Sequence, residues 1–577
     1  MQKHIAAISV GFAAAFFFFY PISDGDIFWH LAAGREIVRT HAVPYVDPFA
    51  FTSRDLPWTD LHWLFQVGMF GMQSLFGLKG VLIANSVLPG LAAGLLFFLY
   101  APAKALFFNA CFWIAALFEI RYLAPHRPIM ASLLLLAAFI CCLELFGRRN
   151  KLRYLACLFP LQVLWTNTQP LFMLGPAIVL AWLTAEIAQG YIPYLPSLHK
   201  SPGRQAAKRR VLTLAGALIL LCLAPLANPY GPKAFKLAFL LFHRTRASPD
   251  NLFSLLIDEN RSLPALFGTS DAHYAWATVA LTALACVSMA LAPRGVRLPL
   301  AFVAMGMAFL AFRSERNIIL YFFSVLPLLS VQLPAAFASL MEWRPTLRRY
   351  VGIPALVAMT SLAIYAVAAH AAVSAQIDGS GAVAPFSFPD GSVAYLAAHP
   401  VAGNGFNADR HGGYLLWKSY PPRKVFIDTR YALRPDSFLA EYSALLDDPV
   451  SFGLACDRYG ITYAILPTAL VTRYLRLATA LLNDPDWRLV YADGTEALFY
   501  KSQAAEMAGI AGITRIAGMD LDDTLTIDSR LREIRSSRWG SNRNLREEAA
   551  VYLAQFLERM GRKESAEYVY RSMDKGR

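Results

Sequence analysis

Long apolar runs separated by short polar segments fill the first 373 residues of the chain. A helix that crosses a bilayer needs about 20 mostly apolar residues, and eleven runs come close enough to be candidates. They lie at 5–20, 80–100, 105–120, 129–146, 154–167, 170–187, 211–227, 272–292, 298–312, 317–340 and 350–373. The apolar stretch 62–76 is short, and we expect it to lie in the interface as an amphipathic helix. The pattern predicts a polytopic α-helical membrane protein with about 11 spans.

A different pattern begins near residue 374. Residues 374–502 are rich in Gly, Pro, Asp and Tyr, and their apolar runs are short and strand-like, as at 424–427 and 463–466. They are predicted to form an α/β domain outside the membrane. Residues 503–577 are predicted to form a linker and a C-terminal helical pair that resembles one tetratricopeptide (TPR) unit. One such repeat is too few to stand alone, so the alternative is two plain helices packed on the domain. The first predicted domain, 1–373, includes a long exterior loop at 21–79.

Composition and charge set the expected orientation. Residues of the AVILMFWYC set make up 56% of the chain and charged residues 16%, against about 25% in typical soluble domains, which excludes an ordinary soluble enzyme. The loops 148–153, 200–210, 293–297 and 342–349 are strongly basic, and the positive-inside rule assigns such loops to the cytoplasm. All four share a side with the N-terminus if 62–76 does not cross. We therefore expect a cytoplasmic N-terminus and an exterior C-terminus. The net charge of +13 then needs no nucleic-acid partner.

Two carboxylates, Asp24 and Asp26, follow the first predicted span at the membrane–water boundary. Carboxylates at that depth cost free energy unless they are paired, solvated or bound to a metal, so the pair is a candidate catalytic site. Either residue could act as a general base, or both could bind Mg²⁺ or Mn²⁺ through their hard oxygen ligands. The alternative is that Asp24 caps the helix whose first turn contains Asp26.

Basic residues on the expected outer side form a second candidate site. Arginine suits a phosphate because its planar fork presents several donors, and a lipid phosphate would need such groups at membrane level. The alternative is that these side chains snorkel to the interface without a ligand. The candidate phosphate-binding residues are Arg121, His126, Arg127, Lys233, Arg313 and Arg316.

Further polar residues are candidate accessory groups. Asp428 and Arg430 at an expected strand end either form a structural ion pair or face the membrane site. His62, beside Asp60, is either a ligand or a hydrogen-bonded interfacial residue. The glycine pair 412–413 before an apolar segment indicates close backbone packing. The accessory candidates are His30, Asp47, Asp60, His62, Asp428 and Arg430.

Ordered motifs run from about residue 20 to 500. They are DGDIFWHLAAGREI (24–37), PYVDPFAFT (44–52), PWTDLHWLFQ (57–66), RYLAPHRP (121–128), VLWTNTQPLFMLG (163–175), NPYGP (228–232), RSERNIILYF (313–322), GGYLLWKSYPPRKVFIDTR (412–430) and DRYGITYAIL (457–466). This series resembles a group of bacterial multispan membrane proteins of GT-C-type glycosyltransferase-like character. The resemblance implies a GT-C-like bundle in the bacterial inner membrane with a periplasmic α/β domain. GT-C enzymes carry an acidic motif in the first exterior loop, the place that Asp24 and Asp26 occupy here. One departure is Asn-Thr-Gln-Pro at 167–170, where the group commonly has Asn-x-His-Gly.

The resemblance implies a membrane glycosyltransferase that takes sugar from a polyprenyl-phosphate or polyprenyl-pyrophosphate lipid. The acceptor would be a glycan, lipid or protein on the exterior face, with Asp24 or Asp26 as base or metal ligand. The alternative is a non-catalytic membrane scaffold or assembly factor that binds a protein partner through its exterior domain and C-terminal helices. A transporter is disfavoured because the predicted spans contain few buried charges and no inverted repeat is evident.

Overall fold

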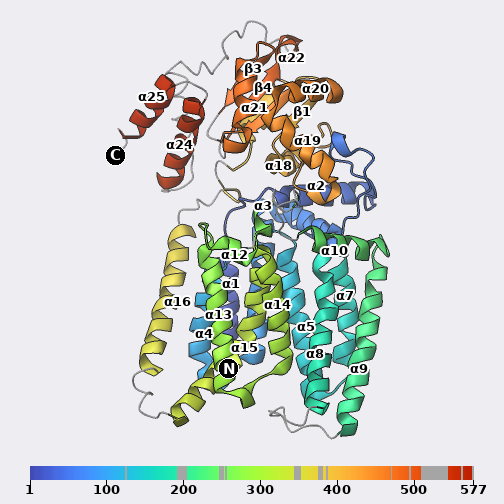
Figure 1. The fold of residues 1–577 in the computed structure, drawn as a ribbon, viewed down its shortest axis with the longest axis vertical. Coiled ribbons are helices and arrows are strands. Elements are labelled where there is room, and N and C mark those ends of the chain that lie inside the picture. Colours follow the sequence, from blue (N-terminus) through green and yellow to red (C-terminus); the bar gives the residue numbers. More distant parts are fainter. Residues whose placement is uncertain are drawn as a thin grey trace. The chain divides into compact units, whose positions relative to one another are not determined.

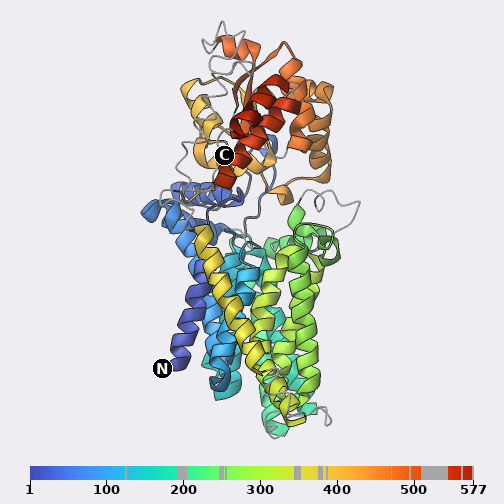
Figure 2. The ribbon, with the colours of Figure 1, turned by 90° about the vertical axis from the view of Figure 1, so that its left-hand side faces the viewer.

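The computed structural model describes residues 1–123, 126–191, 204–245, 253, 257–343, 352–374, 381–384, 387–468, 471–492, 495–507, 543–559 and 563–574. Contacts divide the chain into two compact units. Unit 1 comprises Met1–Tyr20 and Thr59–Val373, and unit 2 comprises Pro21–Trp58 and Ser374–Arg577. Figures 1 and 2 show the chain in two views related by a quarter turn.

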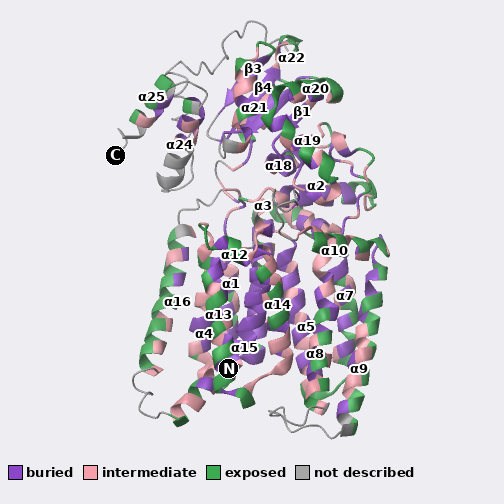
Figure 3. Ribbon diagram, in the orientation of Figure 1, coloured by how far each residue is buried: buried purple, intermediate pink, exposed green. Residues whose placement is uncertain are grey.

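Unit 1 is a bundle of helices that run roughly side by side (Figures 1 and 2). Its main helices are α1 (Gln2–Phe17), α3 (Trp63–Tyr100), α4 (Leu106–Glu119), α5 (Ile129–Arg149), α7 (Leu158–Thr166), α8 (Leu174–Tyr191), α9 (Arg204–Leu223), α10 (Lys233–Arg244), α13 (Ala272–Leu291), α14 (Leu298–Arg313), α15 (Ile318–Trp343) and α16 (Ile353–Ser374). Short elements join them, among them α6 (Arg153–Ala156), α12 (Leu263–Leu266), η3 (Pro170–Met173), η4 (Ala224–Ala227), η5 (Asp258–Asn260) and η7 (Glu315–Asn317). The core of the unit runs along α15, where every residue from Ile318 to Ser330 is buried (Figure 3).

Seven of the described helical segments are long and apolar enough to cross a membrane. They are Trp63–Tyr100, Ile129–Arg149, Pro170–Gly190, Ala207–Ala227, Ala272–Leu291, Glu315–Trp343 and Ile353–Ala372. The other four predicted spans are also helical, as α1, α4, α7 and α14, but these helices have only 16, 14, 9 and 16 residues. The prediction of a helical chain with many apolar spans is confirmed, and the count of 11 stays a prediction.

The apolar stretch 62–76 joins the following span through a break inside α3. Gly77 has φ +65° and ψ −166°, a non-helical backbone that separates the two halves of the helix. The turn is tight, because a Cβ on Gly80 would lie 2.5 Å from the carbonyl oxygen of Met72. Glycine is the residue that adopts such a left-handed conformation without steric cost. The halves 63–76 and 78–100 are therefore separate helical segments that follow different directions.

One end of unit 1 gathers basic residues from segments far apart in the sequence. Arg148 and Arg297 both pair with the buried Glu144, at 2.7 and 2.5 Å. Arg210 donates to the carbonyl oxygen of Gly147 at 3.3 Å. Three of the predicted basic loops thus meet at this end; of the loops 200–210 and 342–349, residues 200–203 and 344–349 lie outside the described residues.

Unit 2 is built around a four-stranded sheet. The strands β1 (Asn404–Asn407), β2 (Ile461–Pro467), β3 (Trp487–Ala492) and β4 (Glu496–Lys501) lie in the order β1-β2-β4-β3. The β1–β2 pair is parallel, whereas β2–β4 and β3–β4 are antiparallel. Helices and short turns complete the unit: α2 (Asp26–Thr40), η1 (Phe51–Ser53), α17 (Asp390–Ala398), α18 (Asp409–Ser419), η9 (Tyr431–Leu433), α19 (Asp436–Asp447), α20 (Pro449–Tyr459), α21 (Val471–Asn483), α22 (Ser502–Met507), α24 (Arg543–Arg559) and α25 (Lys563–Asp574). Of the predicted linker at 503–540, residues 508–540 lie outside the described residues.

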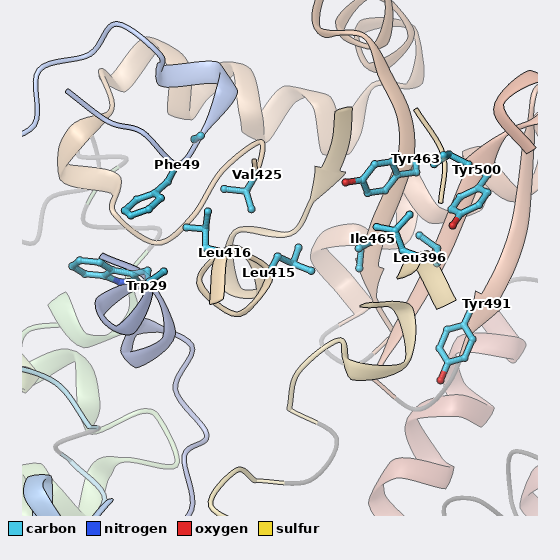
Figure 4. Close-up of a cluster of buried hydrophobic side chains, with 14 of the residues drawn as sticks. Trp29, Phe49, Leu396, Leu415, Leu416, Val425, Tyr463, Ile465, Tyr491 and Tyr500 are labelled. Carbon is cyan, nitrogen blue, oxygen red and sulfur yellow. The ribbon is translucent and has the colours of Figure 1, made fainter. Parts of the chain in front are cut away.

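The first loop supplies part of the core of unit 2. Figure 4 shows Trp29 and Phe49 in one buried cluster with Leu416 and Val425 of the later segment. By its contacts, Pro21–Trp58 belongs with unit 2, whereas the sequence grouped the loop 21–79 with the membrane domain. The physical reason is burial, since the aromatic side chains of the loop leave water by packing on the domain.

One predicted strand is confirmed and the other is wrong. The stretch 463–466 lies in β2. The stretch 424–427 lies outside all four strands, because the backbone of Val425 pairs with the first loop instead of the sheet. Its N–H donates to the carbonyl oxygen of Phe49 at 3.2 Å, and its own carbonyl oxygen accepts from the N–H of Phe51 at 3.1 Å.

Candidate functional site: an acidic helix start and an arginine cluster

The acidic pair stands at the start of α2 in unit 2. Asp24 accepts a hydrogen bond through Oδ1 from the backbone N–H of Asp26 at 3.2 Å, which satisfies one of the N–H groups that a helix start leaves unpaired. Asp26 accepts a hydrogen bond through its own Oδ1 from the hydroxyl of Thr429. Both carboxylates remain partly exposed, and the helix dipole favours negative charge at this end. Asp24 therefore bonds to the first backbone N–H of α2 from outside the helix, whose N-cap residue is Gly25. Thr429, 403 positions further along the chain, holds Asp26.

A buried arginine fixes the segment that carries Thr429. The guanidinium of Arg430 pairs with Asp428 at 2.6 Å and with Asp47 at 2.9 Å, and the three side chains are almost entirely buried. Burial alone would raise the pKa of Asp428, but the charge and hydrogen bonds of Arg430 outweigh it and hold that pKa below its usual value. The guanidinium also lies 4.6 Å from the ring centroid of Trp58, a cation–π contact. We call Asp47, Asp428 and Arg430 the arginine clamp.

The predicted close packing at the glycine pair is present. A Cβ on Gly412 would lie 2.2 Å from the carbonyl oxygen of Ile427, and one on Gly413 would lie 2.5 Å from the carbonyl oxygen of Gly25. Real Cβ atoms are not found at such distances. The two glycines therefore let α18 approach both the start of α2 and the segment leading to the clamp. The clamp and the glycine pair together position Asp26 from two sides.

In unit 1, Tyr122 and His126 pack against the end of the first segment. The ring of Tyr20 lies 5.3 Å from that of Tyr122 and 4.8 Å from that of His126, and His126 is buried. Tyr20 is the last residue of this segment of unit 1. The acidic pair begins four residues further along the chain, at Asp24.

Two of the predicted phosphate-binding arginines share one carboxylate. Arg127 pairs with Glu259 at 2.6 Å, and Arg316 lies 3.7 Å from the same side chain. The side chains of all three are about a quarter to a third exposed. The two guanidinium groups thus share one carboxylate. Sequence reasoning missed Glu259, because no motif marked the polar segment in which it lies.

The same end carries a second ionic cluster. Arg261 pairs with Asp271 at 2.6 Å and with Glu315 at 2.9 Å. The backbone N–H of Glu315 also donates to the carbonyl oxygen of Arg261 at 2.9 Å. These bonds join η5 and η7, and so fix Glu259 relative to Arg316.

The remaining basic candidates contact aromatic rings or lie elsewhere. The guanidinium of Arg121 lies 3.6 Å from the ring centroid of Phe118 and donates to the carbonyl oxygen of that residue at 2.5 Å. Arg313 lies 4.4 Å from the ring of Phe242 in α10. Lys233 is the exposed first residue of α10. The structure therefore brings together Arg127 and Arg316, but gives Arg121 and Arg313 separate aromatic contacts.

The accessory candidates in unit 1 organise the start of α3. Asp60 is buried and accepts from the backbone N–H of His62 at 3.1 Å and from Nε2 of Gln66 at 3.0 Å. The indole of Trp63 donates to Oδ1 of Asn167 at 2.8 Å, and Asn228 donates to the same atom at 3.1 Å. The motif 167–170 thus supplies Asn167, whose side chain holds the start of α3 and Asn228 together. In unit 2, His30 is buried against the ring of Trp29.

The residues present fit a divalent cation only in part. No group of three or more His, Cys, Asp or Glu side chains suited to a metal occurs among the described residues. Mg²⁺ is commonly held by one or two carboxylates together with substrate phosphate and water. Asp24 and Asp26 therefore suit an ion that the substrate also binds, and do not form a site built from protein ligands alone.

Comparisons with known proteins give no family. No family model matches the chain, and no curated protein matches it. Solved structures of similar fold include the oligosaccharyltransferase AglB from Archaeoglobus fulgidus in complex with an inhibitory peptide and a dolichol-phosphate, at 12% identity and TM-score 0.48 over 82% of this chain and 71% of that one. The same enzyme tethered to an acceptor peptide containing the NVT sequon matches at 11% identity and TM-score 0.47, over 82% and 70%. Its complex with Zn and sulfate matches at 11% identity and TM-score 0.43, over 83% and 69%. At these scores the likeness carries no functional conclusion.

Proposed function

We propose that the protein is a membrane glycosyltransferase that moves a sugar from a polyprenyl-phosphate or polyprenyl-pyrophosphate lipid to an acceptor on the exterior face. The observation that carries the proposal is the arrangement at Tyr20. The ring of Tyr20 lies 4.8 Å from that of His126, which directly precedes Arg127. From Tyr20 the chain leads within four residues to Asp24. Basic and acidic candidates are thus linked through one short stretch of chain.

The cluster of Arg127, Arg316 and Glu259 suits the phosphate of the donor. Arg127 and Arg316 already bind one anion, the carboxylate of Glu259. A guanidinium fork binds carboxylate and phosphate through the same donors, so a lipid phosphate can take the place of Glu259. A sugar-linked polyprenyl phosphate carries one negative charge, as the carboxylate does, and a polyprenyl pyrophosphate carries two. The exchange therefore keeps or increases the negative charge that the two guanidinium groups hold.

The acidic pair suits the acceptor side of the reaction. Asp26 would take the proton of the acceptor hydroxyl or amide while the acceptor atom attacks C1 of the sugar. The new bond to C1 forms on the face opposite the phosphate, the bond from C1 to the phosphate oxygen breaks, and its electron pair leaves with the lipid phosphate. Arg127 and Arg316 would stabilise the charge that develops there. A Mg²⁺ or Mn²⁺ ion held by Asp24 and Asp26 would supply further positive charge to the leaving phosphate.

The proposed orientation places the N-terminus in the cytoplasm of a bacterial cell and the acidic pair on the periplasmic side. The gathering of Arg148, Arg210 and Arg297 at one end of unit 1 supports it, because cytoplasmic loops carry an excess of Lys and Arg. The donor would then be a lipid-linked sugar of the inner membrane, and the acceptor would be a glycan, lipid or protein of the cell envelope.

The test is turnover by the purified full chain in lipid nanodiscs supplied with polyprenyl-linked sugars and envelope acceptors. Release of free polyprenyl phosphate is followed by mass spectrometry. We expect Asp26→Asn to slow release by about 10²-fold or more, the scale of a lost general base, with Asp24→Asn strongly impaired. Asp55→Asn, in the same loop and exposed, is the matched control and should leave the rate unchanged.

Full activity of both Asp24→Asn and Asp26→Asn would overturn the proposal. No release by the parent protein, together with capture of a defined envelope protein by unit 2, would favour the scaffold function instead. Size-exclusion profiles of all variants keep a folding defect apart from a lost reaction.

A further inference from the structure

We propose that α10 is a binding surface for the anionic headgroups of the surrounding bilayer, independent of the reaction proposed above. The helix has 12 residues, Lys233–Arg244, and so is about 18 Å long. The hydrocarbon core of a bilayer is about 30 Å thick, so α10 is too short to cross it. Figure 1 shows it lying across the end of the bundle of unit 1 rather than among the long helices.

Contacts within unit 1 place α10 level with the ends of the long helices. It packs on η3, which leads into α8, and on η4, which follows α9. The ring of Phe235 lies 5.9 Å from that of Phe172 in η3. At the other end of α10, Arg313, the last residue of α14, donates to the carbonyl oxygen of Phe242 at 3.3 Å. Both ends of α10 therefore lie where long apolar helices stop.

Three stripes with helical spacing run along α10. Ala234 and Ala238 are buried and face the rest of unit 1. A second stripe is aromatic, and Phe239 and Phe242 in it are 55% and 43% exposed. A third stripe carries two lysines. The residues of the aromatic stripe are Phe235, Phe239 and Phe242. The third stripe, called the cationic stripe for its two lysines, contains Lys233 and Lys236 together with Leu240 and His243.

This division of the exposed surface matches a helix in the interfacial plane. Such helices bury an apolar side at the boundary of acyl chains and headgroups and turn basic residues toward anionic lipid. The helix contains no Asp or Glu. Within the described parts of the chain, no carboxylate forms an ion pair with Lys233 or Lys236. The cationic stripe thus lacks an internal counter-charge there, which anionic headgroups would supply.

The two lysines differ in this respect from the arginines of the proposed donor site. Arg127 and Arg316 are held by Glu259, whereas Lys233 and Lys236 are exposed on a helix surface. Flexible ammonium groups suit a fluid surface of many headgroups, while a planar guanidinium suits one fixed phosphate. We therefore assign Lys233 to the bilayer rather than to the substrate.

The test is hydrogen exchange of the peptide that covers 233–244, with the full chain in nanodiscs. Discs of phosphatidylcholine alone are compared with discs that contain 30% phosphatidylglycerol. We expect slower exchange in α10 with phosphatidylglycerol, and the difference should disappear in 0.5 M salt because screening acts over a few ångströms there. Each lysine should strengthen binding to anionic headgroups by about fivefold. The double variant Lys233→Gln/Lys236→Gln should therefore show no difference in exchange between the two kinds of disc. The control Lys418→Gln, on an exposed side chain of unit 2, should keep it.

Equal exchange in the two kinds of disc would overturn the proposal, as would a difference that survives in the double variant. Protection of α10 by inorganic phosphate in phosphatidylcholine discs would assign the lysines to a soluble anion and would also overturn it. None of these outcomes depends on glycosyl transfer, because exchange is measured without donor or acceptor.

Discussion

The arginine clamp yields the sharpest prediction about how Asp26 is held. Arg430→Met removes the cation that Asp47 and Asp428 share and leaves two buried carboxylates without it. Removing one partner of a buried ion pair costs about 3–5 kcal/mol. We expect the free energy of opening the backbone pairing between Phe49 and Val425 to fall by that amount. This corresponds to exchange about 10²- to 10⁴-fold faster at the backbone amide of Val425, which is bonded to Phe49.

The pH dependence gives the prediction its sign. In the parent, the pKa of Asp428 is held below its unfolded value of about 3.9, so the clamp stabilises unit 2 above about pH 4 and loses this contribution as the pH falls through the folded pKa. In Arg430→Met, the largest influence that lowers the pKa of Asp428 is lost, and burial then raises that pKa. The loss of stability in Arg430→Met should therefore be largest near pH 8 and shrink as Asp428 protonates toward pH 5.

Hydrogen exchange of the full chain in nanodiscs, read by mass spectrometry and converted to opening free energies, measures both effects. Arg458→Met is the matched control in the same unit, because its pair with Glu441 is on the surface and is expected to contribute less than about 1 kcal/mol. A fall in opening free energy for Arg430→Met that is no larger than that for Arg458→Met would refute the reasoning. A deficit that is the same at pH 5 and pH 8 would refute its electrostatic part.

Three further predictions follow from single residues. Gly413→Ala should displace the start of α2 and impair turnover, because its Cβ would meet the carbonyl oxygen of Gly25, whereas Gly453→Ala in open space should not; equal rates in the two variants would contradict this. Burial and the nearby Arg410 lower the pKa of His411 to about 3. The free energy of unfolding of unit 2 should therefore fall by about 2 kcal/mol between pH 7 and pH 5, as the histidine of the unfolded state protonates. In denaturant titrations, His411→Leu should show a weaker dependence of that free energy on pH. In a chain without its native cysteines, Ala440→Cys should react with an impermeant thiol reagent applied from outside and Gln205→Cys should not; the reverse pattern would invert the proposed topology.

The sequence predicted those parts of the fold that depend on local pattern. Continuous apolar runs predicted the long helices, and the short strand-like run at 463–466 predicted β2. The glycine pair 412–413 indicated a close backbone approach, and it is present. These features follow from the residues of one segment, so one sequence is enough to find them.

What depends on contacts between distant segments was out of reach. Val425 resembles a strand residue, but its backbone partners are Phe49 and Phe51, nearly 400 residues earlier. Likewise, the sequence left open whether the motif that contains Thr429 forms a structural ion pair or faces the membrane site. In the structure Arg430 pairs with Asp47 while Thr429 bonds to Asp26. Partner choice of this kind depends on which buried groups need a counter-charge, and that is known only once the segments have met.

A density map of the Asp26→Asn variant in nanodiscs with a polyprenyl-phosphate sugar tests the central claim most directly, because this variant should bind donor without consuming it. The proposed function predicts phosphate density within hydrogen-bond distance, about 3 Å, of Arg127 and Arg316, with the carboxylate of Glu259 displaced. A map at saturating donor in which both arginines still contact Glu259, and the phosphate lies elsewhere, would contradict it.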